Sequence, residues 1–122
     1  MDRIVVTKRC YDLLKKYVDL TQTQPNHYKT FNERILELLD AELDISGFRL
    51  VLGIMRLYIT DLEYTSEHRH VFLEDRTTDF LTLYCFNNDY RNFNEGLYNL
   101  IEKAINRITI KNLKQEYEEV TH

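Results

Sequence analysis

The chain has 122 residues, of which 43% are hydrophobic, and a formal net charge of −4. This length and apolar content fit a single domain, residues 1–122, and the acidic balance argues against a nucleic-acid-binding module. Only three glycines and one proline leave few tight turns, which argues against a many-stranded sandwich or barrel. We therefore expect a compact all-α domain.

The first helix is predicted from Thr7 to about Leu20. Residues 1–6, MDRIVV, form a short apolar lead-in, and Thr7 is the expected N-cap. Apolar residues then recur at steps of three and four: Cys10, Leu13, Leu14, Tyr17 and Val18. The segment TQTQPNHY carries the only proline and is expected to be a loop. These features predict one amphipathic helix followed by a connection.

The second helix is predicted to begin after Thr30. Thr30 and Glu33 have capping-box spacing. A stripe of apolar residues follows: Phe31, Ile35, Leu38 and Leu39. The segment DISG at 44–47 is then expected to turn the chain, with Asp44 or Ser46 capping the next helix.

The central helix, 48–64, is the most apolar stretch of the chain, with FRLVLGIMRLYITDL at 48–62. Its polar positions recur at steps of four, three and four: Arg49, Gly53, Arg56 and Thr60. On a helix they form one narrow stripe with apolar side chains around most of the remainder. Such a helix is expected to be buried, and a domain of this size covers both flanks of that stripe with difficulty.

The segment 65–79 has no clear periodicity, and both a short helix and an extended crossing are open. Residues 80–86, FLTLYCF, suit a short helix capped by Thr78, while their alternation leaves a strand as the second interpretation. That strand gives the fallback fold class, α+β with one short strand pair.

The strongest helical pattern lies at 90–108. Seven apolar residues keep helical spacing over four turns: Phe93, Leu97, Leu100, Ile101, Ala104, Ile105 and Ile108. The β-branched run at 108–110 is expected to break or bend this helix. Leu113, Tyr117 and Val120 indicate a last helical piece, and residues 115–122 are expected to fray. The complete prediction is five to seven helices around the 48–64 helix.

No catalytic motif stands out. His68 and His70 have acidic residues nearby, but two histidines and scattered carboxylates do not define a third metal ligand. An enzyme built on these histidines remains an alternative. The chain has no phosphate loop, dinucleotide fingerprint or nucleophile elbow. We expect no enzymatic activity, no metal and no cofactor.

The localisation expected from the sequence is the cytosol or nucleus. Cys10 and Cys85 are embedded in apolar patterns and form no redox motif, so they are expected to be buried thiols in a reducing compartment. No secretory signal precedes them, and the longest apolar run is shorter than a membrane span requires.

The leading functional prediction is a non-enzymatic interaction or assembly protein, acting as a homodimer or as a subunit of a larger complex, with no nucleic-acid or membrane partner. The predicted contact residues are an apolar flank with neighbouring tyrosines: Phe48, Leu52, Ile59, Tyr64 and Tyr98. The alternative is a small regulatory or inhibitory accessory protein, for example a viral one, that binds its target through an acidic 30–80 surface. Residues 30–80 hold eleven acidic and five basic residues, and the expected contacts are Asp40, Glu42, Asp44 and Glu63.

Overall fold

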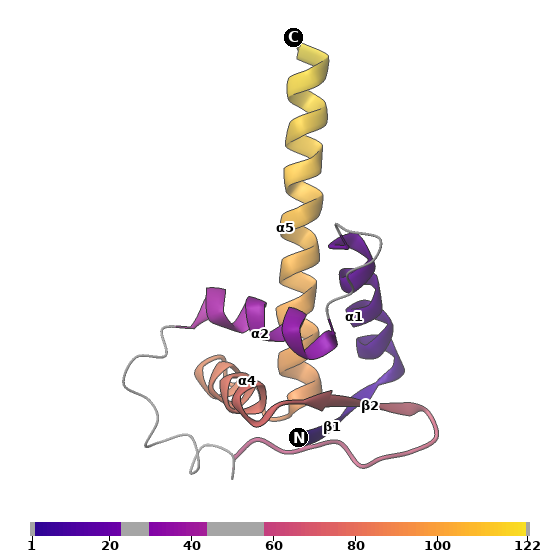
Figure 1. The fold of residues 1–122 in the computed structure, drawn as a ribbon, viewed down its shortest axis with the longest axis vertical. Helices are drawn as coiled ribbons and strands as arrows, with labels where there is room; N and C mark the ends of the chain where they lie inside the picture. Colours follow the sequence, from indigo (N-terminus) through magenta and orange to yellow (C-terminus); the bar gives the residue numbers. More distant parts are fainter. Residues whose placement is uncertain (1, 23–29, 44–57, 122) are drawn as a thin grey trace.

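A computed structural model describes residues 2–22, 30–43 and 58–121 of the chain. These residues form two strands and four helices in the following order (Figure 1): β1 Asp2–Thr7, α1 Lys8–Leu20, α2 Phe31–Glu42, β2 His68–Leu73, α4 Asp75–Asn87 and α5 Phe93–Thr121. The fold is mostly helical with one short antiparallel strand pair. The α+β fallback therefore fits the described residues, and the prediction of five to seven helices is wrong for them.

The first two helices follow the sequence prediction. The Thr7 hydroxyl accepts a hydrogen bond from the Cys10 N–H at 3.1 Å, and α1 ends at Leu20. The Thr30 hydroxyl accepts a bond from the Glu33 N–H at 3.2 Å and caps α2. Each cap satisfies a backbone donor that the first helical turn leaves without a partner.

The strand pair lies outside the segment that the fallback proposed. Residues 80–86 belong to α4, whereas the apolar lead-in forms β1 and the ambiguous segment forms β2. The register pairs Ile4 with Val71 and Val6 with Arg69. Ile4, Val5 and Val6 are all buried, so β1 lacks the alternation of a strand with one wet face.

The described residues that precede β2, 58–67, contact one edge of this sheet. Residues 58–64, expected to end the central helix, are not helical, and residues 48–57 lie outside the described part of the chain. The Asp61 carboxylate accepts a hydrogen bond from the Val5 N–H at 2.7 Å. Partial burial raises the pKa of Asp61, while the Val5 and Leu62 N–H bonds and the His70 charge oppose that shift. This non-helical segment thus supplies an acceptor for the Val5 N–H, which lies on the edge of β1 that is not paired with β2.

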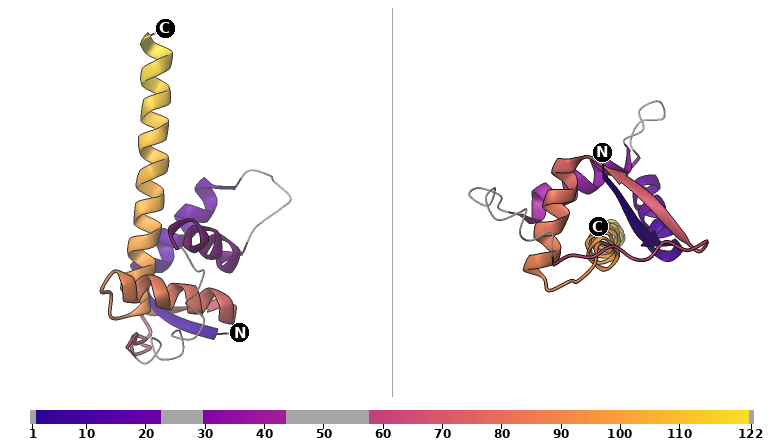
Figure 2. Two further views of the ribbon diagram at one scale, coloured as in Figure 1. Left: turned by 90° about the vertical axis from the view of Figure 1, so that its left-hand side faces the viewer. Right: turned by 90° about the horizontal axis from the view of Figure 1, so that it is seen from below.

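Helix α5 fills the centre of the fold. Seen from below, its first turns are surrounded by α1, α4 and the strand pair (Figure 2). Its fully buried residues Leu97, Leu100 and Ile101 join a core that includes Leu14, Ile35 and Leu81. The Asn94 amide oxygen also accepts the Thr7 N–H at 2.8 Å, and so fixes α5 to the β1–α1 junction.

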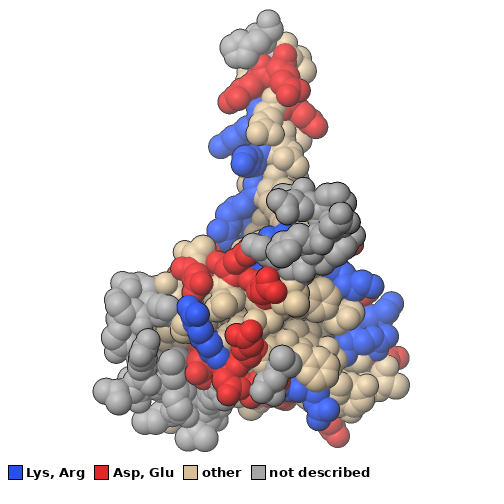
Figure 3. All heavy atoms as spheres, viewed as in Figure 1, with Lys and Arg blue, Asp and Glu red and all other residues tan. Residues whose placement is uncertain are grey.

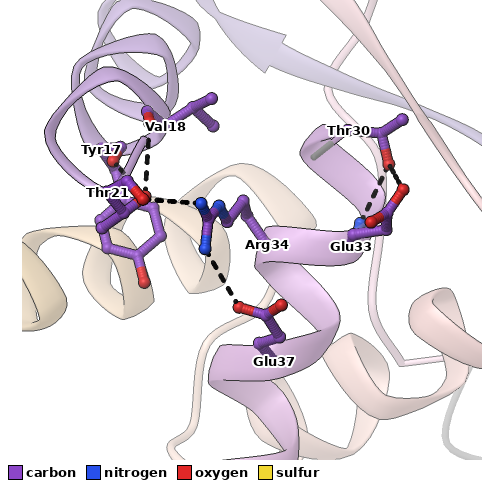
Figure 4. Close-up of polar contacts among 7 residues, drawn as sticks. All are labelled: Tyr17, Val18, Thr21, Thr30, Glu33, Arg34 and Glu37. Carbon is purple, nitrogen blue, oxygen red and sulfur yellow. Dashed lines mark hydrogen bonds and ion pairs between the residues drawn. The ribbon is translucent and has the colours of Figure 1, made fainter. Parts of the chain in front are cut away.

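Arg34 ties α2 to the end of α1 (Figure 4). This buried side chain donates from Nη2 to the Thr21 carbonyl oxygen at 2.7 Å and from Nη1 to Glu37 Oε2 at 3.4 Å. The Thr21 hydroxyl in turn donates to the Tyr17 carbonyl oxygen at 2.9 Å. A guanidinium beside the last carbonyls of a helix is favourable in both hydrogen bonding and charge.

Both cysteines are free and buried, as the apolar patterns around them indicate. Cys85 lies on α4 against Gly96 of α5, where a methyl group on Gly96 would overlap the Cys85 sulfur. Burial raises the pKa of each thiol from 9.0 to about 12. Both thiols are therefore protonated, and poor nucleophiles, at neutral pH.

Candidate interaction surface

The five predicted contact residues do not lie together in the described part of the chain. Ile59 is only 6% exposed and belongs to the core, so its side chain is not accessible to a partner. Tyr64 is exposed and stacks on His70 with ring centres 4.3 Å apart. Tyr98 packs against the core beneath the Arg9 guanidinium. Phe48 and Leu52 lie outside the described residues.

The two histidines on β2 are held by local contacts. His68 Nδ1 lies 2.7 Å from the Glu63 carbonyl oxygen, and His70 is covered by Tyr64. Within residues 2–22, 30–43 and 58–121, no group of three or more His, Cys, Asp or Glu residues is placed to hold a metal ion.

A hollow of about 440 Å³ lies beside the start of α1, and three of the residues that line it are basic: Lys8, Arg9 and Arg69. Their charged groups are engaged elsewhere. Lys8 pairs with Asp12 at 3.7 Å, Arg9 lies over the Tyr98 ring, and Arg69 donates to the Ser66 and His68 carbonyl oxygens. The hollow therefore lacks a cation directed at a bound anion.

The acidic surface predicted for residues 30–80 is partly described. Asp40, Glu42 and Glu63 are exposed, and Asp44 lies outside the described residues. Acidic side chains gather over the lower body of the molecule (Figure 3), but Glu42 Oε1 accepts from Arg107 Nη2 at 2.7 Å. Binding of a basic target through this surface stays a prediction. Its affinity for the target should fall steeply between low and moderate ionic strength.

The most unusual surface belongs to α5, which continues far beyond the body of the molecule (Figures 1 and 2). We call residues 93–108 the packed half and residues 109–121 the projecting half. The expected break at 108–110 does not occur, since one helix runs from Phe93 to Thr121. From Thr109 to Val120 every residue is exposed, over a length of roughly 18 Å. The expected fraying of 115–122 stays a prediction.

The projecting half carries an apolar stripe of four exposed residues: Ile110 (53%), Leu113 (59%), Tyr117 (71%) and Val120 (86%). Their spacing of three, four and three places them along one side of the helix. With about 3.6 residues in each turn, this side is opposite to the one that Leu97, Leu100 and Ile101 bury in the core. The described part of the body therefore packs on the side of α5 that is opposite to the apolar stripe.

This arrangement is suited to binding another helix. Apolar residues at alternating steps of three and four are the seam of helix pairs, and burying one aliphatic side chain is worth about 1.5–3 kcal/mol. Leu113, Tyr117 and Val120 were predicted to share a last helical piece, but the predicted break at 108–110 separated them from Ile110 and from the packed half. A single helix over Phe93–Thr121 places all four residues of the apolar stripe on one side.

Comparisons with known proteins add no relative. The chain matches no family model, and neither the curated proteins nor the solved structures contain a significant match. Among the described helices, none combines the length and the apolar character that crossing a membrane requires.

Proposed function

We propose that this chain is a non-enzymatic interaction or assembly protein that binds a helix of another protein molecule through the projecting half of α5. The observation that carries the proposal is the exposed apolar stripe on a helix that leaves the body. In proteins most helical stability comes from packing of an apolar face, not from intrinsic propensity. The projecting half has such a face and leaves it exposed.

The surroundings of the apolar stripe support a protein partner over a small ligand. The stripe runs along a convex helix, whereas small molecules bind in concave pockets. Its residues alternate with charged residues, including Lys111, Lys114 and Glu116, which keep the surface soluble until a partner binds. The buried, free cysteines support a reducing compartment such as the cytosol or nucleus.

The test compares two double substitutions on the same helix. Leu113→Asp with Tyr117→Asp places charge in the apolar stripe, and Asn112→Asp with Gln115→Asp places equal charge on other faces. We expect only the first variant to lose the proteins that chemical cross-linking captures on the tagged full chain in its native cells. Helical circular dichroism should be retained by both variants. Equal capture by the two variants would contradict the proposal.

A further inference from the structure

We infer that the partner of the apolar stripe is a different protein, whose helix carries one acidic flank and one basic flank beside its own apolar residues. This inference rests on the proposed function and adds to it the chemistry that selects the partner. The observations that support it are the positions and the free charges of Lys114 and Glu116, which we call the charged flanks.

The charged flanks lie on opposite sides of the apolar stripe. A turn of about 3.6 residues corresponds to about 100° for each residue, which places Lys114 and Glu116 roughly 80° to either side of the mean direction of the stripe. The other charges of the projecting half, Lys111, Glu118 and Glu119, point farther away from the stripe. In a helix pair, the charges beside the apolar seam are the ones that set the choice of partner. Lys114 and Glu116 therefore occupy the two selective positions.

Both charged flanks are available to a partner. Lys114 and Glu116 are exposed, and within the described part of the chain neither forms an ion pair or a side-chain hydrogen bond. Arg107 differs, because it pairs with Glu42 at 2.7 Å, and Glu118 already has a contact within the chain. Basic side chains lie along one edge of the projecting helix (Figure 3).

The charged flanks determine what the partner must supply. A helix that packs along the apolar stripe brings one of its own flanks beside Lys114 and the other beside Glu116. Acidic residues on the first flank and basic residues on the second pair with the two free charges, whereas the reverse places like charges together. A helix with the same charge on both flanks satisfies only one of the two.

A second copy of the chain fits the charged flanks poorly. In an antiparallel pair of copies that crosses at the middle of the stripe, Lys114 meets Lys114 of the other copy and Glu116 meets its Glu116. In a parallel pair the two bodies lie side by side, and the packed half brings exposed polar residues into the contact: Glu102, Lys103 and Asn106. A different protein can present complementary residues in either orientation.

The first experiment exchanges the charged flanks without changing the composition of the chain. Lys114→Glu with Glu116→Lys reverses the sign on both sides of the stripe. Lys111→Glu with Glu119→Lys makes the same exchange farther from the stripe and is the matched control. Each tagged full chain is cross-linked in its native cells, and the proteins compared are those that the double substitution in the apolar stripe releases.

We expect the flank exchange to lower the recovery of these proteins by roughly fivefold or more, because two favourable charge pairs become repulsive. The control exchange should lower it by less than about twofold. Helical circular dichroism should be the same for both variants. Equal recovery with the two exchanges would overturn the inference.

The second experiment uses the captured protein after its identification by mass spectrometry. Its helix should carry acidic residues on one flank and basic residues on the other. Exchanging those residues should restore binding to the chain with exchanged flanks and weaken binding to the native chain. A captured helix that lacks charges of opposite sign on its two flanks would overturn the inference.

The third experiment measures mass in solution by sedimentation over a wide concentration range. The native chain should remain near 14.8 kDa. A dimer that dissociates when the apolar stripe is substituted would identify a second copy as the occupant. That result would overturn the inference and leave the proposed function standing.

The first experiment also separates the inference from the proposed function. Captured proteins that depend on the apolar stripe but not on the flank exchange would overturn the inference alone. Captured proteins that do not depend on the apolar stripe would overturn both.

Discussion

The packed half and the projecting half of α5 have similar apolar spacing but opposite environments. In the packed half, Leu97, Leu100 and Ile101 are fully buried by the other elements. In the projecting half, Ile110, Leu113 and Tyr117 are exposed on the other side of the same helix. A continuous helix can therefore present one apolar side to its own domain and another to a different molecule. The spacing alone does not reveal which environment each side meets.

The largest expected difference between the halves is in thiol reactivity. Cys85 packs against the packed half, and burial raises its pKa to about 12, so its thiolate fraction at pH 8 is about 1000-fold below that of a thiol with a pKa near 9. A cysteine introduced by Gln115→Cys in the projecting half should react with iodoacetamide at an ordinary rate. Mass spectrometry of partly alkylated, folded protein measures both sites. Equal rates at positions 85 and 115 would contradict the buried environment.

The raised pKa of the two native thiols also sets a pH dependence. Cys10 and Cys85 each have a folded pKa of about 12 against 9.0, so the folded chain retains protons that the unfolded chain releases. Their contribution to stability is complete below about pH 9 and is lost as the pH rises toward 12. Urea unfolding at pH 8 and pH 10.5 should show this loss, and Cys10→Ala with Cys85→Ala should reduce it.

Truncating one leucine in each half should produce the next largest contrast. Leu100 is fully buried, so Leu100→Ala should lower the free energy of unfolding by about 2–5 kcal/mol through lost burial and a cavity. Leu113→Ala removes an exposed side chain and should change it by less than about 0.5 kcal/mol. Urea unfolding of the two variants at the same protein concentration measures both. A large loss from Leu113→Ala would show that the projecting half packs on the body.

Adding a methyl group should distinguish the halves by a smaller amount. An alanine normally stabilises a helix relative to glycine, but the new methyl at Gly96 would overlap the Cys85 sulfur. We expect Gly96→Ala to lower the free energy of unfolding by about 1–3 kcal/mol. Asn112→Ala in the projecting half should be neutral or slightly stabilising. Combining Gly96→Ala with Cys85→Ala should cost less than the sum of the two single changes, whereas additive effects would contradict the close contact.

The smallest expected contrast concerns two asparagines of α5. Asn94→Ala removes the oxygen that accepts the Thr7 N–H and should cost about 1 kcal/mol of stability. Asn106 is exposed in the packed half, so Asn106→Ala provides a control expected to have little effect. Thermal unfolding of the two variants measures the difference. Equal melting temperatures would mean that the bond from Asn94 to β1 contributes nothing measurable.

Local patterns predicted α1 and α2 well, whereas α4 and α5 are longer than predicted and residues 58–64 are not helical. Capping residues and apolar spacing located α1 and α2 because both signals lie within a few residues of each other. The β-branched residues at 108–110 suggested a break in α5, but each lowers helix propensity by only a fraction of a kcal/mol. One such run did not interrupt a helix that the core already holds through Leu97 and Ile101.

The strand pair and the candidate surface were harder to predict, for different reasons. β1 pairs with a segment more than sixty positions away, and no local pattern records such a partner. Its consecutive Ile4, Val5 and Val6 also lack the alternation that marks a strand. The sequence shows the spacing of the residues in the apolar stripe, but it does not show whether their side chains are exposed or buried. Their exposure depends on how far the body of the protein extends along α5.

The pairing of β1 with β2 has a consequence for the time course of synthesis. The ribosome makes Asp2–Thr7 more than sixty positions before the hydrogen-bonding partner of each residue in His68–Leu73. The core can close only after residues 93–105 of α5, which supply many of its buried side chains, have also been synthesised. Contacts so distant along the chain slow folding, and an unpaired apolar strand invites association with other nascent chains. A chaperone that shields β1 during translation should therefore raise the yield of native protein.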